Sequence, residues 1–158
     1  MILVENLSKR FGNLTAVDHL NFEVRKNEIF GLLGPNGAGK TTTINLICGL
    51  LEATDGRVIF EDFPGRNRKS MIGYCPQENI FYHKLTCLEQ LLFIGQLYGI
   101  HRKILRQRAS DLLDLLGLRE KKLQLATKLS GGMKRRLNIC LAMIHDPPIL
   151  IMDEPTSA

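Results

Sequence analysis

The residues with the clearest chemistry are Gly34 to Thr41, which read GPNGAGKT and match the pattern G-x-x-x-x-G-K-[ST] at every fixed position. Glycines allow the backbone to curl until its N–H groups point inward, and a following helix adds positive potential, so this loop suits phosphate. The pattern assigns Lys40 to the β- and γ-phosphates of a nucleoside triphosphate and the Thr41 hydroxyl to Mg²⁺. An ordinary glycine-rich turn between a strand and a helix is the alternative. The expected nucleotide-binding residues of this loop are Gly34, Pro35, Asn36, Gly37, Ala38, Gly39, Lys40, Thr41 and Thr42.

A second reactive group stands near the end of the chain, where Asp153 and Glu154 follow the apolar run ILIM. In proteins with a phosphate loop of this kind, a second apolar strand ends in an Asp that holds Mg²⁺, often through water. We expect Asp153 to hold the metal and Glu154 to act as the general base that polarises the attacking water. An acidic turn after a buried strand would explain the pair if it stood alone.

The strands and the helix that must position these residues follow from the spacing of apolar side chains. Residues 1–11 and 20–34 carry apolar side chains at strand spacing, and the expected strand Ile29–Leu33 leads into the loop. From Lys40 the apolar residues recur at helical spacing, and Asp55–Gly56 then introduces a short strand, RVIFED. Strand, loop, helix and strand is an α/β order.

Helices dominate the second half of the sequence. The first is expected to begin at a capping box formed by Thr86 and Glu89, and the second to cover residues 102–116. The third follows Ser130 and ends before a Pro-Pro pair. The expected layout is therefore an α/β core that is interrupted by an all-helical insert and resumes at Ile149.

Bulk composition excludes some classes of protein and leaves others open. A chain of 158 residues can bury a single core, and its net charge of +5 fits an anionic ligand, a nucleic acid or an anionic membrane surface equally well. The four cysteines are far apart in the sequence, with no C-x-x-C spacing, and nothing at the N-terminus resembles a signal peptide. A reduced, cytosolic protein is expected. No apolar stretch approaches the roughly 20 residues that cross a bilayer.

The segment LSGGMKRRL, Leu129 to Leu137, sits at the expected start of the third helix and closely resembles the LSGGQ signature of ABC-type ATPases. The resemblance extends over essentially the whole chain, and its motifs occur in the family's order. Besides the signature, these are LSKRFG and AVDHLNFEV (N-terminal strands), GPNGAGKTT (phosphate loop), GYCPQ (Q-loop) and ILIMDEPTSA (Walker B).

The resemblance to this family implies both a fold and a domain organisation. The implied fold is α/β: a P-loop NTPase (RecA-like) core with an N-terminal antiparallel β subdomain and an inserted α-helical subdomain. The chain would form one incomplete ABC nucleotide-binding domain over residues 1–158. Residues 1–78 would supply the core, residues 79–145 the helical subdomain with the signature, and residues 146–158 the Walker B strand.

The resemblance also gives roles to residues that the spacing alone leaves undecided. Phe11 matches the aromatic residue that stacks on adenine, although a lone aromatic is more often part of a core. Gln77 matches the glutamine whose amide oxygen approaches Mg²⁺ and the attacking water. Ser130, Gly131 and Gly132 match the residues that contact the γ-phosphate of ATP held by a second copy of the domain, and they also suit a plain helix N-cap.

Two features of the signature helix depart from the usual pattern or suggest another partner. Met133 replaces the usual Gln, and we expect a modest effect because the backbone and Ser130 provide most phosphate contacts. The basic run Lys134–Arg136 could suggest nucleic acid. Three basic residues on an exposed helical face are usually solvated, so no nucleic acid partner is expected.

Later motifs of the family do not occur within these 158 residues. The D-loop Asp and the switch histidine would follow Walker B, whereas His19, His83, His101 and His145 all precede it. We therefore expect weak or no hydrolysis by these residues alone, with nucleotide binding partly retained.

The resemblance implies the motor of a membrane transporter, on the cytoplasmic face of the membrane. Two such domains would close around two ATP molecules and act on an integral membrane partner through a groove lined by residues 79–98. The motifs resemble exporter-type ATPases more than importers. The alternative is a soluble ABC-type ATPase acting on ribosomes or nucleic acid, but the interval from Gln77 to Ser130 is too short for the long coiled coil of repair members.

Overall fold

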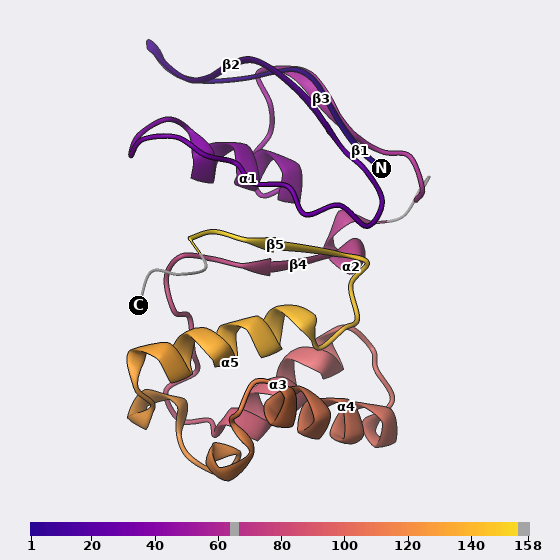
Figure 1. The fold of residues 1–158 in the computed structure, drawn as a ribbon, viewed down its shortest axis with the longest axis vertical. Helices are drawn as coiled ribbons and strands as arrows, with labels where there is room; N and C mark the ends of the chain where they lie inside the picture. The colour runs from indigo at the N-terminus through magenta and orange to yellow at the C-terminus, as the bar shows by residue number, and fades with distance from the viewer. Residues whose placement is uncertain (64–66, 155–158) are drawn as a thin grey trace. The chain divides into compact units, whose positions relative to one another are not determined.

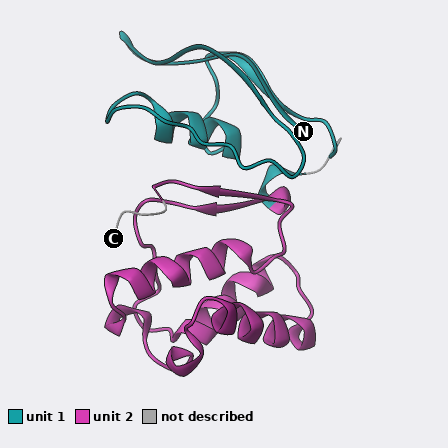
Figure 2. Ribbon diagram, in the orientation of Figure 1, with its two compact units in different colours: residues 1–69 teal, residues 70–158 magenta. Residues whose placement is uncertain are grey.

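The computed structural model describes residues 1–63 and 67–154. The chain forms two compact units, residues 1–69 and residues 70–158 (Figure 2). The expected subdivision at residues 78 and 145 remains a prediction, and the last part of the Walker B segment, residues 155–158, lies outside the described residues.

Unit 1 is built on a three-stranded antiparallel sheet in the order β2-β1-β3 (Figure 1). β1 (Ile2–Phe11) turns at a Gly-Asn pair into β2 (Leu14–Val24), and β3 (Asp55–Phe60) pairs with the other edge of β1. α1 (Lys40–Cys48) packs beside β2. β1 and β3 lie within two residues of the expected segments and α1 begins at Lys40 as expected, whereas β2 covers Leu14–Val24 instead of residues 20–34. The buried apolar side chains of the unit are Ile2, Val4, Leu7, Val17, Ile44, Leu46, Ile47, Cys48, Val58 and Phe60.

The expected strand Ile29–Leu33 was wrong, because this segment forms no strand in the structure. A strand needs a neighbour for its ladder of hydrogen bonds, and within the described part of unit 1 this segment pairs with none. The side chain of Ile29 is 100% exposed and that of Leu33 92% exposed, whereas Phe30 stacks on Phe22 with ring centroids 4.9 Å apart. The segment therefore contacts β2 through the stacking of Phe30 on Phe22.

Unit 2 contains a pair of parallel strands, β4 (Ile72–Cys75) and β5 (Ile149–Met152). The short helix α2 (Arg68–Met71) comes directly before β4. α5 (Gly131–Met143) runs along the strand pair (Figure 1), and it approaches closely because β4 carries a glycine. A Cβ on Gly73 would lie 2.2 Å from the carbonyl oxygen of Ala142, so any larger residue would push the helix away from the strand.

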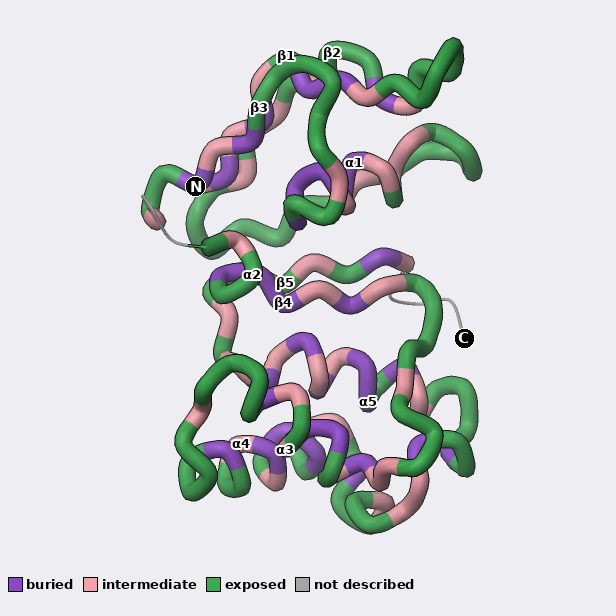
Figure 3. The backbone as a smooth tube through the Cα atoms, turned by 180° about the vertical axis from the view of Figure 1, so that it is seen from behind, coloured by how far each residue is buried: buried purple, intermediate pink, exposed green. Residues whose placement is uncertain are grey.

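The rest of unit 2 is helical. α3 (Cys87–Leu97) and α4 (Arg102–Leu115) pack on each other and on α5, with two 3₁₀ turns, η1 (Arg119–Lys121) and η2 (Ala126–Lys128), between α4 and α5. The faces that the three helices turn toward one another are buried (Figure 3). Their shared core consists of Cys87, Leu91, Leu105, Ala109, Leu112, Leu113, Leu118, Ala126, Leu129, Leu137, Cys140 and Ile144.

The ends of these helices follow local chemistry that the sequence predicts. The capping box is confirmed: the hydroxyl of Thr86 accepts from the backbone N–H of Glu89, and the Glu89 carboxylate accepts from the backbone N–H of Thr86. Gly99 and Gly117 follow α3 and α4 with φ of 73° and 66°, the left-handed conformation in which helices commonly end. None of the described helices is long and apolar enough to span a membrane.

Candidate functional site

The phosphate loop of unit 1 is held by its own lysine. The ammonium of Lys40 donates to the carbonyl oxygen of Gly34 at 2.8 Å and to that of Pro35 at 2.9 Å. Gly37 and Gly39 have φ of 81° and 82°, which the sequence motif anticipates because glycine adopts these angles without strain. The backbone of the loop therefore curls around the ammonium group of Lys40, which belongs to the same loop.

Gly39 has a second reason to be glycine. A Cβ at this position would lie 2.2 Å from the backbone carbonyl oxygen of Ala16 in β2, so the start of α1 sits directly on the sheet. As the N-cap of α1, Gly39 also offers no side-chain acceptor to the N–H donors of the first turn. The positive end of the helix and the Lys40 ammonium together fit an anionic phosphate chain.

Phe11 lies at the end of β1, opposite Leu14 across the turn to β2. Phe11 is 48% exposed, so it is not a core residue. The ammonium of Lys9 lies 5.1 Å from the centroid of the ring and donates to the carbonyl oxygen of Glu52 at 2.7 Å. An aromatic ring held in this way fits stacking on a base.

The two carboxylates and the glutamine meet at one end of the strand pair in unit 2. Asp153 and Glu154 follow β5, and Gln77 follows β4 by two residues. Because parallel strands finish at the same edge, the side-chain amide of Gln77 reaches the Glu154 carboxylate and donates to it at 2.8 Å. The Asp153 side chain is only 3% exposed, and its backbone N–H donates to the carbonyl of Cys75 at 3.0 Å. We call these three residues the catalytic corner.

Arg135 belongs to the basic run that was expected to be solvated. Its guanidinium instead contacts the backbone of the catalytic corner. Its side chain is 5% exposed, so the expectation that the three basic residues are all solvated was wrong for this one. Its guanidinium donates to backbone carbonyl oxygens on both loops of the catalytic corner. Burial raises the pKa of the nearby Cys75 thiol, and the positive charge of Arg135 offsets part of that rise.

The signature residues begin α5. Ser130 is the N-cap, and its hydroxyl accepts from the backbone N–H of Met133 at 3.4 Å. Ser130, Gly131 and Gly132 are exposed, and a Cβ on either glycine would meet nothing within 4 Å. Met133 is partly buried and packs on the helical core, so its side chain contributes to packing.

The oxygen donors expected for Mg²⁺ are chemically suitable, since this hard cation prefers carboxylate, hydroxyl and amide oxygens. Thr41 belongs to unit 1, whereas Gln77 and Asp153 belong to unit 2. Gln77 donates its amide nitrogen to Glu154, and its amide oxygen is the atom that can act as an acceptor or ligand. Among the residues described, no three His, Cys, Asp or Glu side chains gather into a cluster that could hold a metal without a ligand's help.

Comparison with known sequences decides the family. Residues 17–157 match the sequence model of the family described as ABC transporter, and this match covers most of the chain. The chain belongs to the ABC transporter family. The motif-based identification is therefore confirmed.

Several relatives of this ABC chain are similar along its whole length. The linearmycin resistance ATP-binding protein LnrL of Bacillus subtilis is 42% identical over 160 residues, which cover 99% of this chain and 51% of LnrL. The bacitracin transport ATP-binding protein BcrA of Bacillus licheniformis is 40% identical over 161 residues, which cover 99% of this chain and 52% of BcrA. The chain thus spans about half the length of the curated relatives it matches.

Solved structures confirm the fold class. An ATP-binding subunit of an ABC transporter superposes with a TM-score of 0.87 at 29% identity, covering 98% of this chain and 66% of that one. A dimeric ATP-binding cassette bound to ADP and Pi superposes with a TM-score of 0.88 at 26% identity, covering 100% of this chain and 75% of that one. The expected ABC cassette, a P-loop NTPase fold with an antiparallel β subdomain, is present.

Sequence reasoning about the ABC chain missed Arg135 and its helical neighbour Asn138. The side-chain amide of Asn138 donates to the carbonyl oxygen of Glu78 at 3.3 Å and to the side chain of Asn79 at 2.9 Å. A signal was available, because positions 135, 138 and 142 share one face of α5 and Ala142 is apolar. A basic residue on the same face of the helix as Ala142 could therefore have been predicted to be buried.

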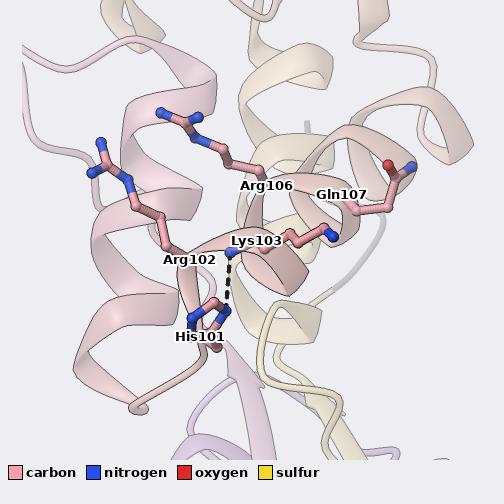
Figure 4. A pocket seen from close by; sticks show the side chains of 5 residues that line it. All are labelled: His101, Arg102, Lys103, Arg106 and Gln107. Atoms are coloured by element: carbon pink, nitrogen blue, oxygen red, sulfur yellow. Dashed lines mark hydrogen bonds between the residues drawn. The ribbon is translucent and has the colours of Figure 1, made fainter.

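Unit 2 also carries a surface pocket (Figure 4). It is a shallow basic hollow of about 570 Å³ at the start of α4, where the Nδ1 atom of His101 accepts from the backbone N–H of Lys103 at 3.4 Å. The side chains of Arg102 and Arg106 extend away from those of Lys103 and Gln107 (Figure 4). Because these groups do not converge, the hollow is a solvated basic surface and no part of the nucleotide site.

Proposed function

We propose that this chain is the ATP-binding and ATP-hydrolysing part of an ABC exporter. The observation that carries the proposal is the phosphate loop, in which Lys40 lies inside a curl of backbone at the N-terminus of α1. Such a loop suits the triphosphate of ATP, and the exposed ring of Phe11 suits the adenine. The proposed Mg²⁺ ligands are the oxygens of Thr41, Gln77 and Asp153.

The contact between Gln77 and Glu154 supports hydrolysis as well as binding. In our proposal Glu154 accepts a proton from the attacking water, and Gln77 holds the Glu154 carboxylate in place at 2.8 Å. Bound Mg²⁺ would supply charge neutralisation for the phosphates.

The open surface around Gly131 and Gly132 supports assembly with a second copy of the domain. Glycine in a helix is less favourable than alanine by about 1 kcal/mol, and nothing in the described part of this chain occupies the space that a Cβ would take. Close approach by another molecule explains two adjacent glycines at this position. We propose that Ser130, Gly131 and Gly132 contact ATP held by the second copy.

We further propose an integral membrane partner and a position on the cytoplasmic face of the membrane. Apolar side chains are exposed on the segment after Gln77, with Ile80 69%, Tyr82 51% and Phe93 38% exposed, and the Tyr82 and Phe93 rings meet edge to face. An exposed apolar patch of this kind suits a protein partner. Export as the direction is supported by the relatives, one of which is a Nod factor export ATP-binding protein of Sinorhizobium fredii, 42% identical over 99% of this chain and 47% of that protein.

The first test is Mg-ATP binding and turnover by the purified chain beside two variants. Lys40→Ala should weaken binding about 10- to 100-fold, because a charge-assisted contact to phosphate is lost. Glu154→Gln should leave binding intact and lower any turnover about 10²- to 10⁴-fold, because the general base is lost. Equal ATP affinity in the wild type and Lys40→Ala would contradict the proposed site.

The expectation that these 158 residues alone hydrolyse ATP weakly or not at all stays a prediction. The same assay tests it, because turnover that depends on Glu154 separates the chain's own chemistry from contaminating ATPases. Robust turnover that Glu154→Gln abolishes would show that the described residues complete a working site.

A further inference from the structure

Arg135 carries a positive charge on a buried side chain. Its side chain is 5% exposed, and among the described residues it takes part in no ion pair. A guanidinium removed from water must be satisfied by other polar groups, since burial of an unpaired charge is destabilising. Backbone carbonyl oxygens accept from its two terminal nitrogens, Nη1 and Nη2.

Those carbonyl oxygens belong to two loops that are far apart in the sequence. The Nη1 atom donates to the carbonyl of Pro76, with that of Gln77 at 3.5 Å. The Nη2 atom donates to the carbonyl of Asp153 at 2.6 Å and to that of Glu154 at 3.0 Å. One planar group therefore bridges the end of β4 and the end of β5.

Glu154, one of the residues held in this way, has a strained backbone. Its φ is 49°, in the left-handed region where a side chain with a Cβ is disfavoured. Such a conformation persists only where surrounding contacts hold it, and such positions are frequent at functional sites. The contact between Arg135 and the Glu154 carbonyl is one of these contacts, and the Gln77 amide on the Glu154 carboxylate is another.

α5 connects the two loops to the signature residues. The helix has Ser130 as its N-cap, and Arg135 follows about 7.5 Å further along the axis at 1.5 Å per residue. Three residues later on the same face, Asn138 holds the backbone of Glu78 and the side chain of Asn79. A displacement of the Ser130 end of this helix would therefore move the loop that carries Gln77.

We propose that Arg135 is a positioning residue for ATP hydrolysis, whose guanidinium fixes the Pro76–Gln77 and Asp153–Glu154 backbones so that the Gln77 amide meets the Glu154 carboxylate. The inference rests on the proposed ATPase function and deepens it. Arg135 contacts none of the reacting groups directly and acts through Glu154 and Gln77. Lysine is a poor replacement, because a single ammonium cannot span carbonyls on two loops as a planar guanidinium does.

The test compares Arg135→Gln and Arg135→Lys with Arg108→Gln in the protein as its gene encodes it. Arg108 is a matched control, because its guanidinium also donates to a backbone carbonyl, that of Ile144 at 3.2 Å, away from the catalytic corner. Arg135→Gln should lower kcat at least tenfold and leave KM and ATP affinity within about twofold. Arg135→Lys should recover part of kcat, and Arg108→Gln should retain the wild-type value.

Hydrogen exchange without nucleotide gives a readout that does not depend on activity. Amides of residues 77–79 and 153–154 should exchange at least tenfold faster in Arg135→Gln, while amides of α3 and α4 keep their protection. In a Gln77→Ala background, Arg135→Gln should have little further effect on kcat, because the contact that Arg135 positions is already lost.

The outcomes separate this inference from the proposed function. A wild type without Lys40-dependent ATP binding would contradict the proposed function. A wild type that binds ATP in this way, combined with an Arg135→Gln variant whose two loops exchange at wild-type rates, would overturn the positioning role alone. An equal loss of protection throughout unit 2 would overturn it too, because Arg135 would then be a general stabiliser.

Discussion

Lys40 and Arg135 both place a cation against backbone carbonyl oxygens, but their partners come from very different distances along the chain. Lys40 reaches carbonyls five and six residues before it. Arg135 reaches carbonyls 58 and 59 residues before it and 18 and 19 residues after it. The phosphate loop of unit 1 is therefore built locally, whereas the catalytic corner of unit 2 depends on packing between distant segments.

This difference implies that damage to packing should affect the two regions unequally. A loop held by neighbours in the sequence needs only its own backbone angles and the sheet beneath it. A corner held by residues from β4, β5 and α5 needs the helix to stay docked on the strand pair.

Leu137→Ala should produce the largest loss of stability. Leu137 is fully buried in the helical core, two residues after Arg135 on α5. Removing a buried leucine side chain lowers the free energy of unfolding by about 2–5 kcal/mol. Urea unfolding combined with hydrogen exchange should show the loss in residues 70–154. Equal loss of protection in β1 and β2 would contradict the separation of the two regions.

Gly39→Ala should disturb the phosphate loop by a smaller amount, with Gly37→Ala as its matched control. Both glycines have φ near 80°, so both alanine variants carry backbone strain of about 1 kcal/mol. Only at Gly39 would the new Cβ also collide with a backbone oxygen, at 2.2 Å, whereas nothing lies within 4 Å at Gly37. In thermal unfolding without nucleotide, the midpoint of Gly39→Ala should be lower than that of Gly37→Ala. Equal midpoints would show that contact between α1 and β2 contributes nothing at this position.

Thr86→Ala should lower the free energy of unfolding by about 1 kcal/mol, because it removes the hydroxyl that caps α3. The capping contacts lower the pKa of the Glu89 carboxyl, with the backbone N–H of Thr86 as the main cause. A carboxyl whose pKa is lower in the folded state stabilises the fold above its unfolded-state pKa, and this contribution is lost as pH falls through the folded-state pKa. Chemical unfolding at neutral and acidic pH checks both effects. A Thr86→Ala variant as stable as the wild type would show that packing alone defines the start of α3.

The smallest expected effect on stability comes from protonation of His145, and it occurs only as the pH falls. Its ring stacks on Tyr98 with centroids 3.9 Å apart. Burial lowers the pKa of His145; the positive charge of Arg108 lowers it further, whereas the Ile72 backbone and the Asp146 carboxylate oppose the shift. Because the folded state disfavours the protonated ring, stability falls as pH drops from the ordinary histidine pKa of about 6.5 toward the folded-state pKa.

His145→Phe keeps an aromatic ring against Tyr98 and removes the titration. Its unfolding midpoint should therefore change less than that of the wild type between about pH 7.5 and pH 5.5. Equal pH dependence in the two proteins would show that other groups cause the acid sensitivity. Chemical denaturation at a series of pH values measures the pH dependence of the unfolding midpoint in both proteins.

Local signals in the sequence predicted much of the fold. The capping box at Thr86 and the start of α1 at Lys40 depend on residues within a few positions of one another, and both are confirmed. Ile29–Leu33 shows where this reasoning fails. An apolar run has strand propensity, but a strand requires a neighbouring strand, which no local pattern supplies.

Residue types and their spacing were enough to predict the family, the order of the motifs and the phosphate loop, because the residues that shape that loop lie within eight positions of one another. Tertiary structure alone decided that Arg135 is buried, that Gln77 meets Glu154, and that Gly73 brings α5 onto β4. Those contacts join segments that are far apart along the chain. Their geometry depends on how helices pack on the strand pair, which residue types and spacing do not specify.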